Sequence, residues 1–390
     1  MRLRDIRSVN VRGKRVLVRV DYNVELEPGG RLRDTTRLTA TLPTIQWLLR
    51  RGARVVLVSH RGRPRGREAR LSLKPLVGPL RRMLKRQVAF LDAPVFSRRL
   101  DEALRTVPPT TIILLENIRY EAGEEDNSPA LAKRLAGLAD LAVNDAFADS
   151  HRSHASIVGV AKYRRMYAGL LLQAEVAALT ALLTKPARPY VAIIGGAKIS
   201  TKLHLLKQLL HQADMVLLGG ALANTLLQAE GVAVGASLTE PTMLKAAEGL
   251  VSTNVKLKIP CDVVVATSRR ARVPTRVTAV GHIGRRDIIL DIGPDTVELF
   301  RRVIKTARTV VWNGPMGVYE LPPFDRGTVA LAKVIAAQRC SSVAGGGETV
   351  DAIRRSGVSR RFTFLSTGGG AMLELLEGKT LPGVAAVSTR

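Results

Sequence analysis

Aromatic residues are scarce in this chain of 390 residues, since two Trp, six Tyr and seven Phe make up only 4% of the sequence. The core must therefore consist mainly of Leu, Val, Ile and Ala. Hydrophobic residues make up 46% and charged residues 24%, which is ordinary for a soluble globular enzyme. A chain of this length usually exceeds one hydrophobic core, so we expect two domains.

Cysteine and long apolar runs are also nearly absent. The two cysteines, Cys261 and Cys340, lie in or beside apolar runs, so we expect buried free thiols and no disulfide framework. No apolar run reaches the roughly 20 residues that a membrane helix needs. The N-terminal segment carries charges throughout, unlike a secretory signal peptide. We therefore expect a cytoplasmic protein with no membrane partner.

Acidic residues are outnumbered, with 33 Asp and Glu against 60 Lys and Arg, which gives a formal net charge of +27. The excess lies mostly in residues 1–100, which carry 25 basic and 7 acidic residues, or +18. Such a field can attract small anions or polyanions. A surface that is merely rich in Arg gives the same total, so the placement of individual arginines has to decide between the two interpretations.

Several familiar site motifs are missing. The sequence contains neither GxxxxGK[ST], the P-loop pattern, nor GxGxxG, the dinucleotide fingerprint. No catalytic triad is evident. His151 and His154 lie three residues apart but lack partners with the spacing of a zinc site.

Dense apolar runs alternate with helical patterns along the chain. Residues 15–24, 53–60, 111–117 and 140–147 are predicted strands, and residues 35–52 a helix that ends at Gly52. The pattern restarts after residue 185. Strands that are apolar on both faces, in alternation with helices, indicate parallel sheets covered on both sides. We predict an α/β protein with two doubly wound, Rossmann-like parallel-sheet domains.

A helical segment without Gly or Pro after Gly169 separates the two halves. We predict an N-terminal domain over residues 1–166, a long connecting hinge helix over 167–184, and a second domain over 185–375. The tail, about 376–390, is expected to pack back on the first domain.

Glycine clusters are the strongest feature of the second half. They follow apolar runs and precede helical segments at Gly195-Gly196, Gly219-Gly220, Gly345-Gly346-Gly347 and Gly368-Gly369-Gly370. Ligands bind at the carboxyl ends of parallel strands. Glycine there lets backbone N–H groups approach phosphate oxygens, and a following helix N-terminus favours negative charge. Tight turns alone would explain one such pair, but four equivalent clusters favour phosphate binding.

Two lysines follow the first cluster. Lys198 and Lys202 are four residues apart, and we place them at the start of a helix, on one face. They would neutralise phosphate charge, although a solvated helix face is the alternative.

In the first half, basic residues recur where predicted strands end or a helix begins, namely at Arg37, His60, Arg63, Arg119 and Arg152. Arginine binds phosphate and carboxylate in a bidentate manner. Five such positions at one sheet edge predict an anion pocket, in which Asp21 and Asn23 could fix hydroxyl groups.

In this order, the motifs resemble those of phosphoglycerate kinase. The segments that carry the resemblance run over essentially the whole chain: RVLVRVDYNV, DTTRLTATLPTI, VVLVSHRGRP, LLENIRY, VNDAFADSHRSH, IIGGAKISTKL, LLGGALANTLL, DIGPDT, VVWNGPMGVYE, VAGGGETV and STGGGAMLELLEGKTLPGV. The resemblance implies reversible phosphoryl transfer between ATP and 3-phosphoglycerate, with Mg²⁺, in glycolysis. It also implies a kinase that works by domain closure and charge neutralisation without a general base. We expect a monomer.

The resemblance also implies roles for individual residues. The acid would be bound by Asp21, Tyr22, Asn23, Arg37, His60, Arg61, Gly62, Arg63, Arg119 and Arg152. The nucleotide would be bound by Gly195, Lys198, Lys202, Gly219, Asn313, Glu320, Gly345, Gly346, Gly347, Glu348 and Thr349, with Glu320 on the ribose. Arg37, Lys198, Gly346 and Gly369 would act in catalysis on the transferring phosphoryl group.

Four positions depart from the family pattern. Glu348 stands where the family usually has the Asp that contacts the Mg²⁺-nucleotide, and its extra methylene puts the metal geometry in doubt. Thr201 replaces an Asp, Arg61 a Leu and Met372 a Ser. None of these changes removes a phosphate-binding group.

Two other functions remain open from the sequence. The basic first hundred residues and the loop 61–70 could bind nucleic acid, but aromatic residues are few and no known binding motif occurs. Another α/β kinase or ligase would share the glycine clusters without the ordered arginines.

Overall fold

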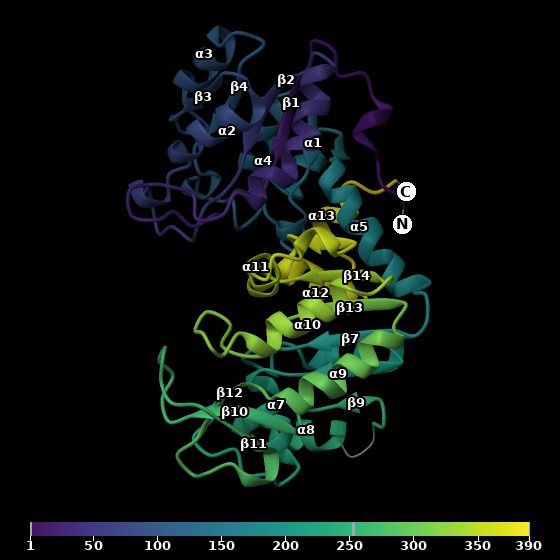
Figure 1. The fold of residues 1–390 in the computed structure, drawn as a ribbon. Coiled ribbons are helices and arrows are strands. Elements are labelled where there is room, and N and C mark those ends of the chain that lie inside the picture. The colour runs from purple at the N-terminus through teal and green to yellow at the C-terminus, as the bar shows by residue number, and fades with distance from the viewer. Residues whose placement is uncertain (1, 252–253, 390) are drawn as a thin grey trace. The chain divides into compact units, whose positions relative to one another are not determined.

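The computed structural model describes residues 2–251 and 254–389, and the chain divides into two compact units (Figure 1). Unit 1 comprises Met1–Ala177 and Thr380–Arg390, and unit 2 comprises Ala178–Lys379. A six-stranded parallel sheet lies at the centre of each unit. The predicted α/β class with two doubly wound parallel sheets is confirmed. Helix α5 (Leu170–Thr184) begins in unit 1 and ends in unit 2.

The sheet of unit 1 has the strand order β3-β4-β2-β1-β5-β6, and all neighbours are parallel. Its strands are β1 (Arg15–Arg19), β2 (Arg54–Val58), β3 (Val88–Leu91), β4 (Ile112–Leu115), β5 (Leu141–Asn144) and β6 (Met166–Ala168). The central strands are buried on both faces, which explains their continuous runs of Val, Leu and Ile. The chain leaves β1 toward β2 on one side and reaches β5 on the other. The β1/β5 boundary is therefore a topological switch point, where α/β sheets bind ligands.

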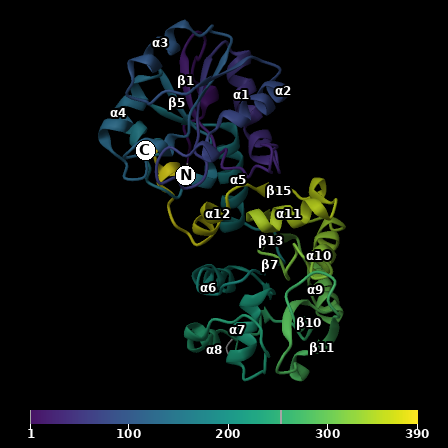
Figure 2. The same ribbon diagram turned by 90° about the vertical axis from the view of Figure 1, so that its left-hand side faces the viewer.

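Helices cover both faces of this sheet. Figure 2 shows α1 (Thr36–Arg50) and α2 (Val77–Leu84) on one face, and α3 (Arg98–Thr106) and α4 (Pro129–Gly137) on the other. In α1, the fully buried Leu38, Ile45 and Leu48 form the apolar stripe that joins the core. The short helix α13 (Pro382–Ala385) belongs to the same unit.

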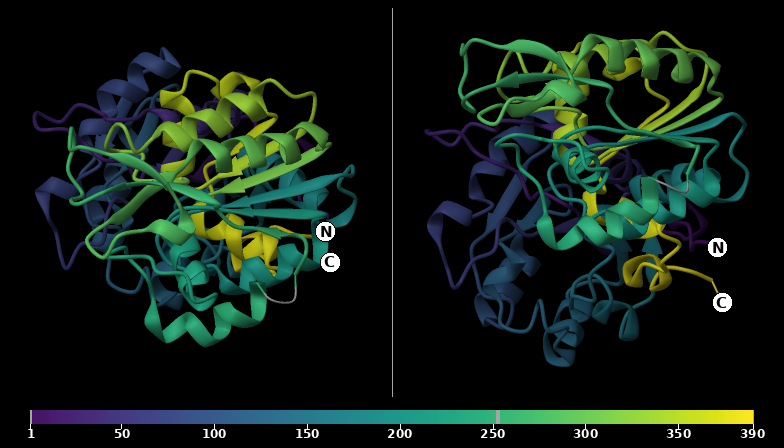
Figure 3. Two further views of the ribbon diagram at one scale, coloured as in Figure 1. Left: turned by 60° about the horizontal axis from the view of Figure 1, so that its bottom comes forward. Right: turned by 90° about the horizontal axis from the view of Figure 1, so that it is seen from below.

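The two ends of the chain lie side by side in unit 1 (Figure 3). Leu3 and Ser388 form an isolated antiparallel bridge, and the Arg4 backbone N–H donates to the Val387 carbonyl at 2.8 Å. The tail is also tied to β5, because Asn144 donates from Nδ2 to the Gly383 carbonyl at 3.2 Å. These bonds place the residues after 380 with unit 1.

The sheet of unit 2 has the order β15-β14-β13-β7-β8-β9, again with parallel neighbours. Its strands are β7 (Tyr190–Ile194), β8 (Met215–Leu218), β9 (Leu257–Lys258), β13 (Thr309–Asn313), β14 (Ser341–Gly345) and β15 (Phe364–Ser366). The switch point here is the β7/β13 boundary. A separate antiparallel sheet consists of β10 (Asp262–Ala266), β11 (Arg276–Ala279) and β12 (Ile288–Ile292), whereas the sequence pattern predicted a parallel arrangement throughout.

The helices of unit 2 that precede or follow these strands are α6 (Leu203–Gln212), α7 (Ala221–Ala229), α8 (Leu244–Val251), α9 (Pro294–Thr306), α10 (Arg326–Ala336), α11 (Gly347–Arg355) and α12 (Gly369–Leu376). In Figure 2, α6 to α8 lie on one side of the parallel sheet and α9 to α11 on the other. The core between them contains the fully buried Trp312 of β13 and Phe300 of α9.

Two expectations require correction. Both cysteines are free, but Cys261 is exposed and Cys340 half-buried, because each lies just outside the buried strand that follows it. Lys198 and Lys202 do not lie within a helix, since α6 begins only at Leu203 and Lys202 is its N-cap. Among the described residues, no helix is both long and apolar enough to cross a lipid bilayer.

Candidate functional site

A cluster of cationic and imidazole side chains lies at the β1/β5 switch point of unit 1. We call it the basic cluster, and it consists of Arg19, Arg37, His60, Arg119 and Arg152. Each comes from a different segment: the end of β1, the first turn of α1, and the loops after β2, β4 and β5. Parallel strands bring these segments to one sheet edge. The predicted convergence of Arg37, His60, Arg119 and Arg152 is therefore found in the fold.

Two buried carboxylates accompany the basic cluster. Asp21 pairs with Arg37, and Asp149 Oδ2 lies 3.2 Å from Arg19 Nη2 and 3.5 Å from His60 Nδ1. Burial alone would raise the pKa of Asp149, but its interaction with the His60 imidazole and the charges of Arg19, Arg37 and Arg119 together hold it well below its usual range. Both carboxylates are outnumbered by the surrounding cations.

Some donors in the basic cluster are buried and unused. Arg119 Nη2 and Arg152 Nε have no hydrogen-bond partner among the described residues. Arg119 Nη1 donates to the Gly62 carbonyl at 2.6 Å, while Nε lies 3.0 Å from Glu125 Oε1 as an ion pair but forms no hydrogen bond with the described residues. Buried donors normally have partners, so these two nitrogens are suited to an anionic ligand.

The side chains of two predicted acid-site residues have partners within the protein. The Tyr22 side chain lies in the core, with its hydroxyl 3.0 Å from Thr41 Oγ1. Arg61 is buried and donates from Nε to the Val24 carbonyl and from Nη1 to the Ser72 carbonyl, each at 3.0 Å. These contacts engage the side chains of Tyr22 and Arg61 within the protein.

The remaining predicted acid-site residues lie near the surface. Asn23 is exposed and accepts a hydrogen bond at Oδ1 from the Gly62 backbone N–H at 2.9 Å. Gly62 has φ +66°, and a Cβ there would lie 2.7 Å from Leu71 Cδ2. Arg63 is exposed and extends from the loop after β2. The fold thus brings Asn23 and Gly62 together, while Arg63 stands apart from the buried contacts of the basic cluster.

Asp21, His60 and Asp149 have ligand atoms within 4.8 Å of one another, a spacing that could suit a metal ion. Their surroundings argue against a cation. Both carboxylates already pair with arginines, and Arg119 and Arg152 add further positive charge. Moreover, His60 Nδ1 is in contact with Arg19 Nη2 at 3.1 Å. We therefore regard this group as part of an anion site.

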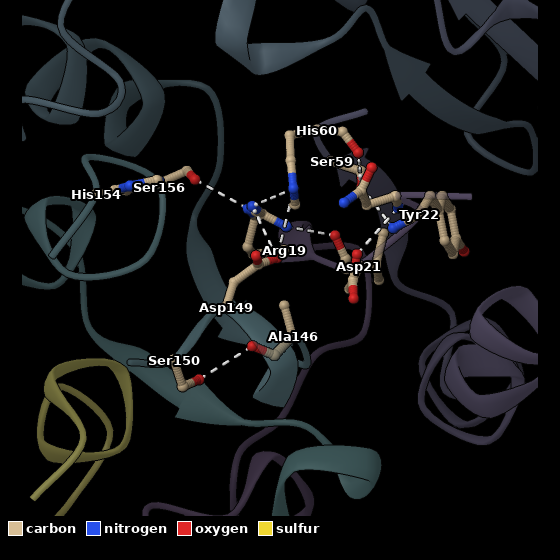
Figure 4. A network of polar contacts seen from close by, with 12 residues as sticks. Arg19, Asp21, Tyr22, Ser59, His60, Ala146, Asp149, Ser150, His154 and Ser156 are labelled. Atoms are coloured by element: carbon tan, nitrogen blue, oxygen red, sulfur yellow. Dashed lines mark hydrogen bonds and ion pairs between the residues drawn. The ribbon is translucent and has the colours of Figure 1, made fainter. Parts of the chain in front are cut away.

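The sequence interpretation missed Arg19, Asp149, Glu124 and Ser156. Arg19 is 2% exposed and lies between Val18 and Val20 at the end of β1, a position that should have drawn attention to it. Figure 4 shows Arg19 surrounded by His60, Asp149 and Ser156. Burial raises the pKa of Glu124 to about 7, although the charge of Arg19 and two hydrogen bonds from Ser156 favour its ionised form. Asp149 and Glu124 contact residues from distant segments of the chain. The sequence around each of them therefore does not indicate its role.

The second group of predicted residues lies at the β7/β13 switch point of unit 2. The Gly195 backbone N–H donates to the Asn313 carbonyl at 2.9 Å, and Asn313 Nδ2 donates to the Gly345 carbonyl at 2.8 Å. A Cβ at Gly195 would lie 2.1 Å from the Pro315 carbonyl oxygen, and one at Gly219 would lie 2.5 Å from Met316 Sδ. Glycine is needed at both positions because the neighbouring chain segments approach so closely.

Glycines also begin the helices around this edge. Gly346 (φ +97°) is the N-cap of α11, Gly347 is its first residue, and Gly369 (φ +41°) begins α12. Thr349 is buried and its Oγ1 accepts a hydrogen bond from the Gly314 N–H at 2.7 Å, which fixes α11 to the loop after β13. Free N–H groups at helix starts can bind phosphate.

The two lysines differ in their surroundings. Lys202 Nζ donates to the Gly195 carbonyl at 2.6 Å, and Lys198 is exposed. Burial lowers the pKa of Lys202 to about 8, while the nearby charge of Glu348 opposes this shift. Both lysines lie in the turn that follows Gly195-Gly196, so they remain beside the glycine cluster although they precede α6.

A pocket of about 150 Å³ opens at this switch point. Its walls are mainly apolar and include Gly196, Gly220, Leu238, Leu290, Pro315, Met316, Val318, Glu320 and Glu348. Glu320 and Glu348 are exposed carboxylates. An apolar slot beside glycine turns and helix N-termini suits a flat base attached to phosphates.

The family model for phosphoglycerate kinase matches residues 6–379. The chain belongs to the phosphoglycerate kinase family. It is therefore an enzyme of the kinase class that transfers phosphate to a carboxylate, and the resemblance found in the sequence is confirmed. The family uses a nucleotide with a metal ion.

Relatives and solved structures agree with this membership. A phosphoglycerate kinase of Desulforudis audaxviator is 47% identical over 389 residues, covering 99% of each chain, and one of Rubrobacter xylanophilus is 48% identical over 392 residues, covering 99% of this chain and 98% of the relative. The structure of phosphoglycerate kinase from Coxiella burnetii matches with a TM-score of 0.85 and 38% identity. That from Pyrococcus horikoshii matches with a TM-score of 0.88 and 30% identity. Each match spans 99% of this chain and 98% of the chain in the solved structure.

Proposed function

We propose that this phosphoglycerate kinase transfers a phosphoryl group reversibly between ATP and the carboxylate of 3-phosphoglycerate, giving ADP and 1,3-bisphosphoglycerate, in glycolysis and gluconeogenesis. The observation that carries the proposal is the separation of two unlike sites. A buried basic cluster lies at the switch point of unit 1, and an apolar pocket with glycine turns lies at that of unit 2. We place the enzyme in the cytoplasm as a monomer.

Unit 1 binds the acid in this proposal. The buried nitrogens of Arg119 and Arg152 that have no hydrogen-bond partner among residues 2–251 and 254–389 contact the phosphate of 3-phosphoglycerate, and His60 and Arg63 contribute from the loop after β2. Asp21 and Asn23 accept hydrogen bonds from the substrate hydroxyl. Gly62, Arg61 and Tyr22 act through the backbone or by shaping the loops, because the two side chains are engaged elsewhere.

Unit 2 binds the nucleotide. The base occupies the apolar pocket, Glu320 contacts the ribose, and the phosphates face Lys202, Asn313 and the N–H groups near Gly346, Gly347 and Gly369. Gly195, Gly219, Gly345 and Thr349 hold the turns in shape. Mg²⁺ suits the exposed Glu348 carboxylate, which would hold it through the nucleotide, because this ion prefers oxygen ligands. When bound, the ion neutralises phosphate charge.

The chemistry needs few protein groups. The attacking carboxylate is already ionised at neutral pH, so no general base is required. Catalysis then depends on alignment and on charge neutralisation around the transferring phosphoryl group. We assign this neutralisation to Arg37, Lys198 and the backbone N–H groups of Gly346 and Gly369. Arg37 is half-buried beside Asp21, which orients its guanidinium.

Transfer requires both substrates to come into line while water is excluded. Because we assign them to different units, we propose that α5 acts as a hinge. Small-angle scattering of the enzyme with 3-phosphoglycerate and a non-hydrolysable ATP analogue together should give a smaller radius of gyration than either ligand alone. An unchanged radius with both ligands would argue against hinge closure.

A coupled assay with ATP and 3-phosphoglycerate tests the reaction itself. We expect turnover with Mg²⁺, loss of turnover when EDTA removes the ion, and recovery on adding Mg²⁺ back. Absence of turnover with both substrates and Mg²⁺ would contradict the proposed function.

A further inference from the structure

Every nitrogen of the Arg19 guanidinium has a partner among the described residues. Its Nε donates to Ser156 Oγ at 2.9 Å, Nη1 donates to the Val20 carbonyl, and Nη2 lies 3.1 Å from His60 Nδ1 and 3.2 Å from Asp149 Oδ2. The side chain is only 2% exposed. Arg19 is therefore held from several sides within the protein, and it can influence a ligand only through its neighbours.

The contact between Arg19 and His60 fixes the state of the imidazole. A guanidinium can donate hydrogen bonds but cannot accept them. His60 Nδ1 must therefore be the acceptor in the 3.1 Å contact, and in a neutral imidazole the hydrogen then sits on Nε2. Burial lowers the pKa of His60 to about 3 against the opposing charge of Asp149, so the ring is neutral at working pH.

Asp149 does not compete for the imidazole hydrogen. Its Oδ2 lies 3.5 Å from His60 Nδ1, longer than an ordinary hydrogen bond, and has no hydrogen-bond partner among the described residues. Its nearest cationic contact is Arg19 Nη2, at 3.2 Å. Asp149 therefore acts as the counter-ion that keeps Arg19 in place among the other cations of the basic cluster.

The opposite end of Arg19 is anchored by a second buried acid. Ser156 Oγ, the acceptor of Arg19 Nε, donates in turn to Glu124 Oε1 at 2.5 Å, and the Ser156 backbone N–H donates to Glu124 Oε2 at 3.0 Å. Glu124 is 1% exposed. The guanidinium is thus held at Nε by a hydrogen-bonded pair and at Nη2 by a counter-ion, which fixes the direction of its hydrogen bond to His60.

We propose that Arg19 and Asp149 are positioning residues for the acid site. Together they hold His60 as the neutral tautomer with hydrogen on Nε2, ready to donate to an oxygen of the bound acid. Nε2 has no partner among the described residues, so this donor remains available. The inference rests on the proposed function for the identity of the acid, but the tautomer itself is a property of the free enzyme.

The direct test is NMR of the full-length free enzyme with ¹⁵N-labelled histidine, in which His60→Gln identifies the His60 signals among those of the six histidines. We expect a protonated, pyrrole-type Nε2 and an unprotonated, pyridine-type Nδ1 between pH 6 and 8. A His60 with hydrogen on Nδ1, or a charged ring in this range, would overturn the proposal. Because no substrate is present, an inactive enzyme with the expected tautomer would contradict only the proposed function.

Asp149→Asn tests the positioning role. Without its counter-ion, Arg19 should move, so that His60 becomes a mixture of tautomers and KM for 3-phosphoglycerate rises about tenfold, in proportion to the loss of one hydrogen bond to a charged group. We expect kcat to change less than KM. A single unchanged tautomer, or a KM that stays the same or falls, would show that Asp149 merely repels the acid or is inert.

Two further variants complete the test. Asp126→Asn removes one exposed charge from the same unit and should leave both the tautomer and KM unchanged. If Asp149→Asn does not fold, Ser156→Ala serves in its place, because it releases Arg19 Nε while keeping every charge. It should shift the tautomer in the same direction, and an unchanged His60 spectrum would overturn the proposal.

Discussion

Buried charges in unit 1 have unlike roles although they lie close together. Arg119 and Arg152 keep buried nitrogens that have no hydrogen-bond partner in the described part of the chain, whereas each nitrogen of the Arg19 guanidinium has one. The exposed fraction of each side chain alone would not distinguish Arg19 from Arg119 and Arg152. The distinction follows from where each nitrogen points, and it divides residues that bind a ligand from those that hold the binding residues.

Arg37 and Lys198 are the side chains that we expect to stabilise the transferring phosphoryl group. Arg37→Ala and Lys198→Ala should each lower kcat by roughly 10²-fold, which is typical for loss of one group that stabilises transition-state charge. The measurement is the coupled assay at saturating ATP and 3-phosphoglycerate. Arg33→Ala and Lys207→Ala, which remove exposed charges nearby, are the matched controls. A loss below about threefold in the two test variants would contradict their catalytic role.

Glu124 should make stability depend on pH. Its pKa is about 7 in the folded chain, above the ordinary value of 4.5, so the folded state holds its proton more tightly than the unfolded state. The stabilisation is present below about pH 4 and is lost as pH rises through 7. We therefore compare the melting temperature of Glu124→Gln with that of the wild type. This difference should be more favourable to the variant at pH 8 than at pH 5. Melting curves check this, with Asp126→Asn as the control, and a pH-independent difference would refute it.

At the scale of elements, apolar density was enough to locate the main strands. The runs 15–24 and 53–60 predicted β1 and β2, because strands of a covered parallel sheet are apolar on both faces. The start of α6 was misplaced because the turn after Gly195-Gly196 contains residues compatible with a helix. The antiparallel sheet β10-β11-β12 could not be distinguished, since β10 and β12 also contain dense Val and Ile.

The site was predictable only in part, for a related reason. Residues at strand ends, such as His60 and Arg152, can be placed at a shared sheet edge from the strand pattern alone. Asp149 and Glu124 act through contacts with Arg19 and Ser156 from other segments, and nothing in their local sequence marks such pairs. Side-chain contacts between distant segments require the fold.

The turn after β7 should tolerate no side chain at Gly195. A methyl group there would lie 2.1 Å from the Pro315 carbonyl oxygen, so Gly195→Ala must push apart the loops after β7 and β13. We expect KM for ATP to rise at least tenfold, with a smaller change in KM for 3-phosphoglycerate. Gly281→Ala, where no atom lies within 4 Å, is the control in the same unit. Equal ATP affinity in both variants would contradict this account of the turn.

At the scale of the whole molecule, the net charge of +27 indicates less about function than the positions of the individual charges do. Many of the 25 basic residues before residue 101 are exposed, and only a few belong to the basic cluster. The large field can speed the approach of anionic substrates at low salt. It does not select between them, and selection depends on the buried groups at the two switch points.

The central claim is that the acid and the nucleotide bind to different units. Isothermal titration of ADP and of 3-phosphoglycerate, each into Arg152→Ala and Lys202→Met, tests it most directly. We predict that Arg152→Ala weakens 3-phosphoglycerate about tenfold or more and leaves ADP unchanged, and that Lys202→Met does the reverse, since each removes a charged contact to one ligand. If either variant weakened both ligands equally, or weakened only the ligand assigned to the other unit, the claim would be contradicted.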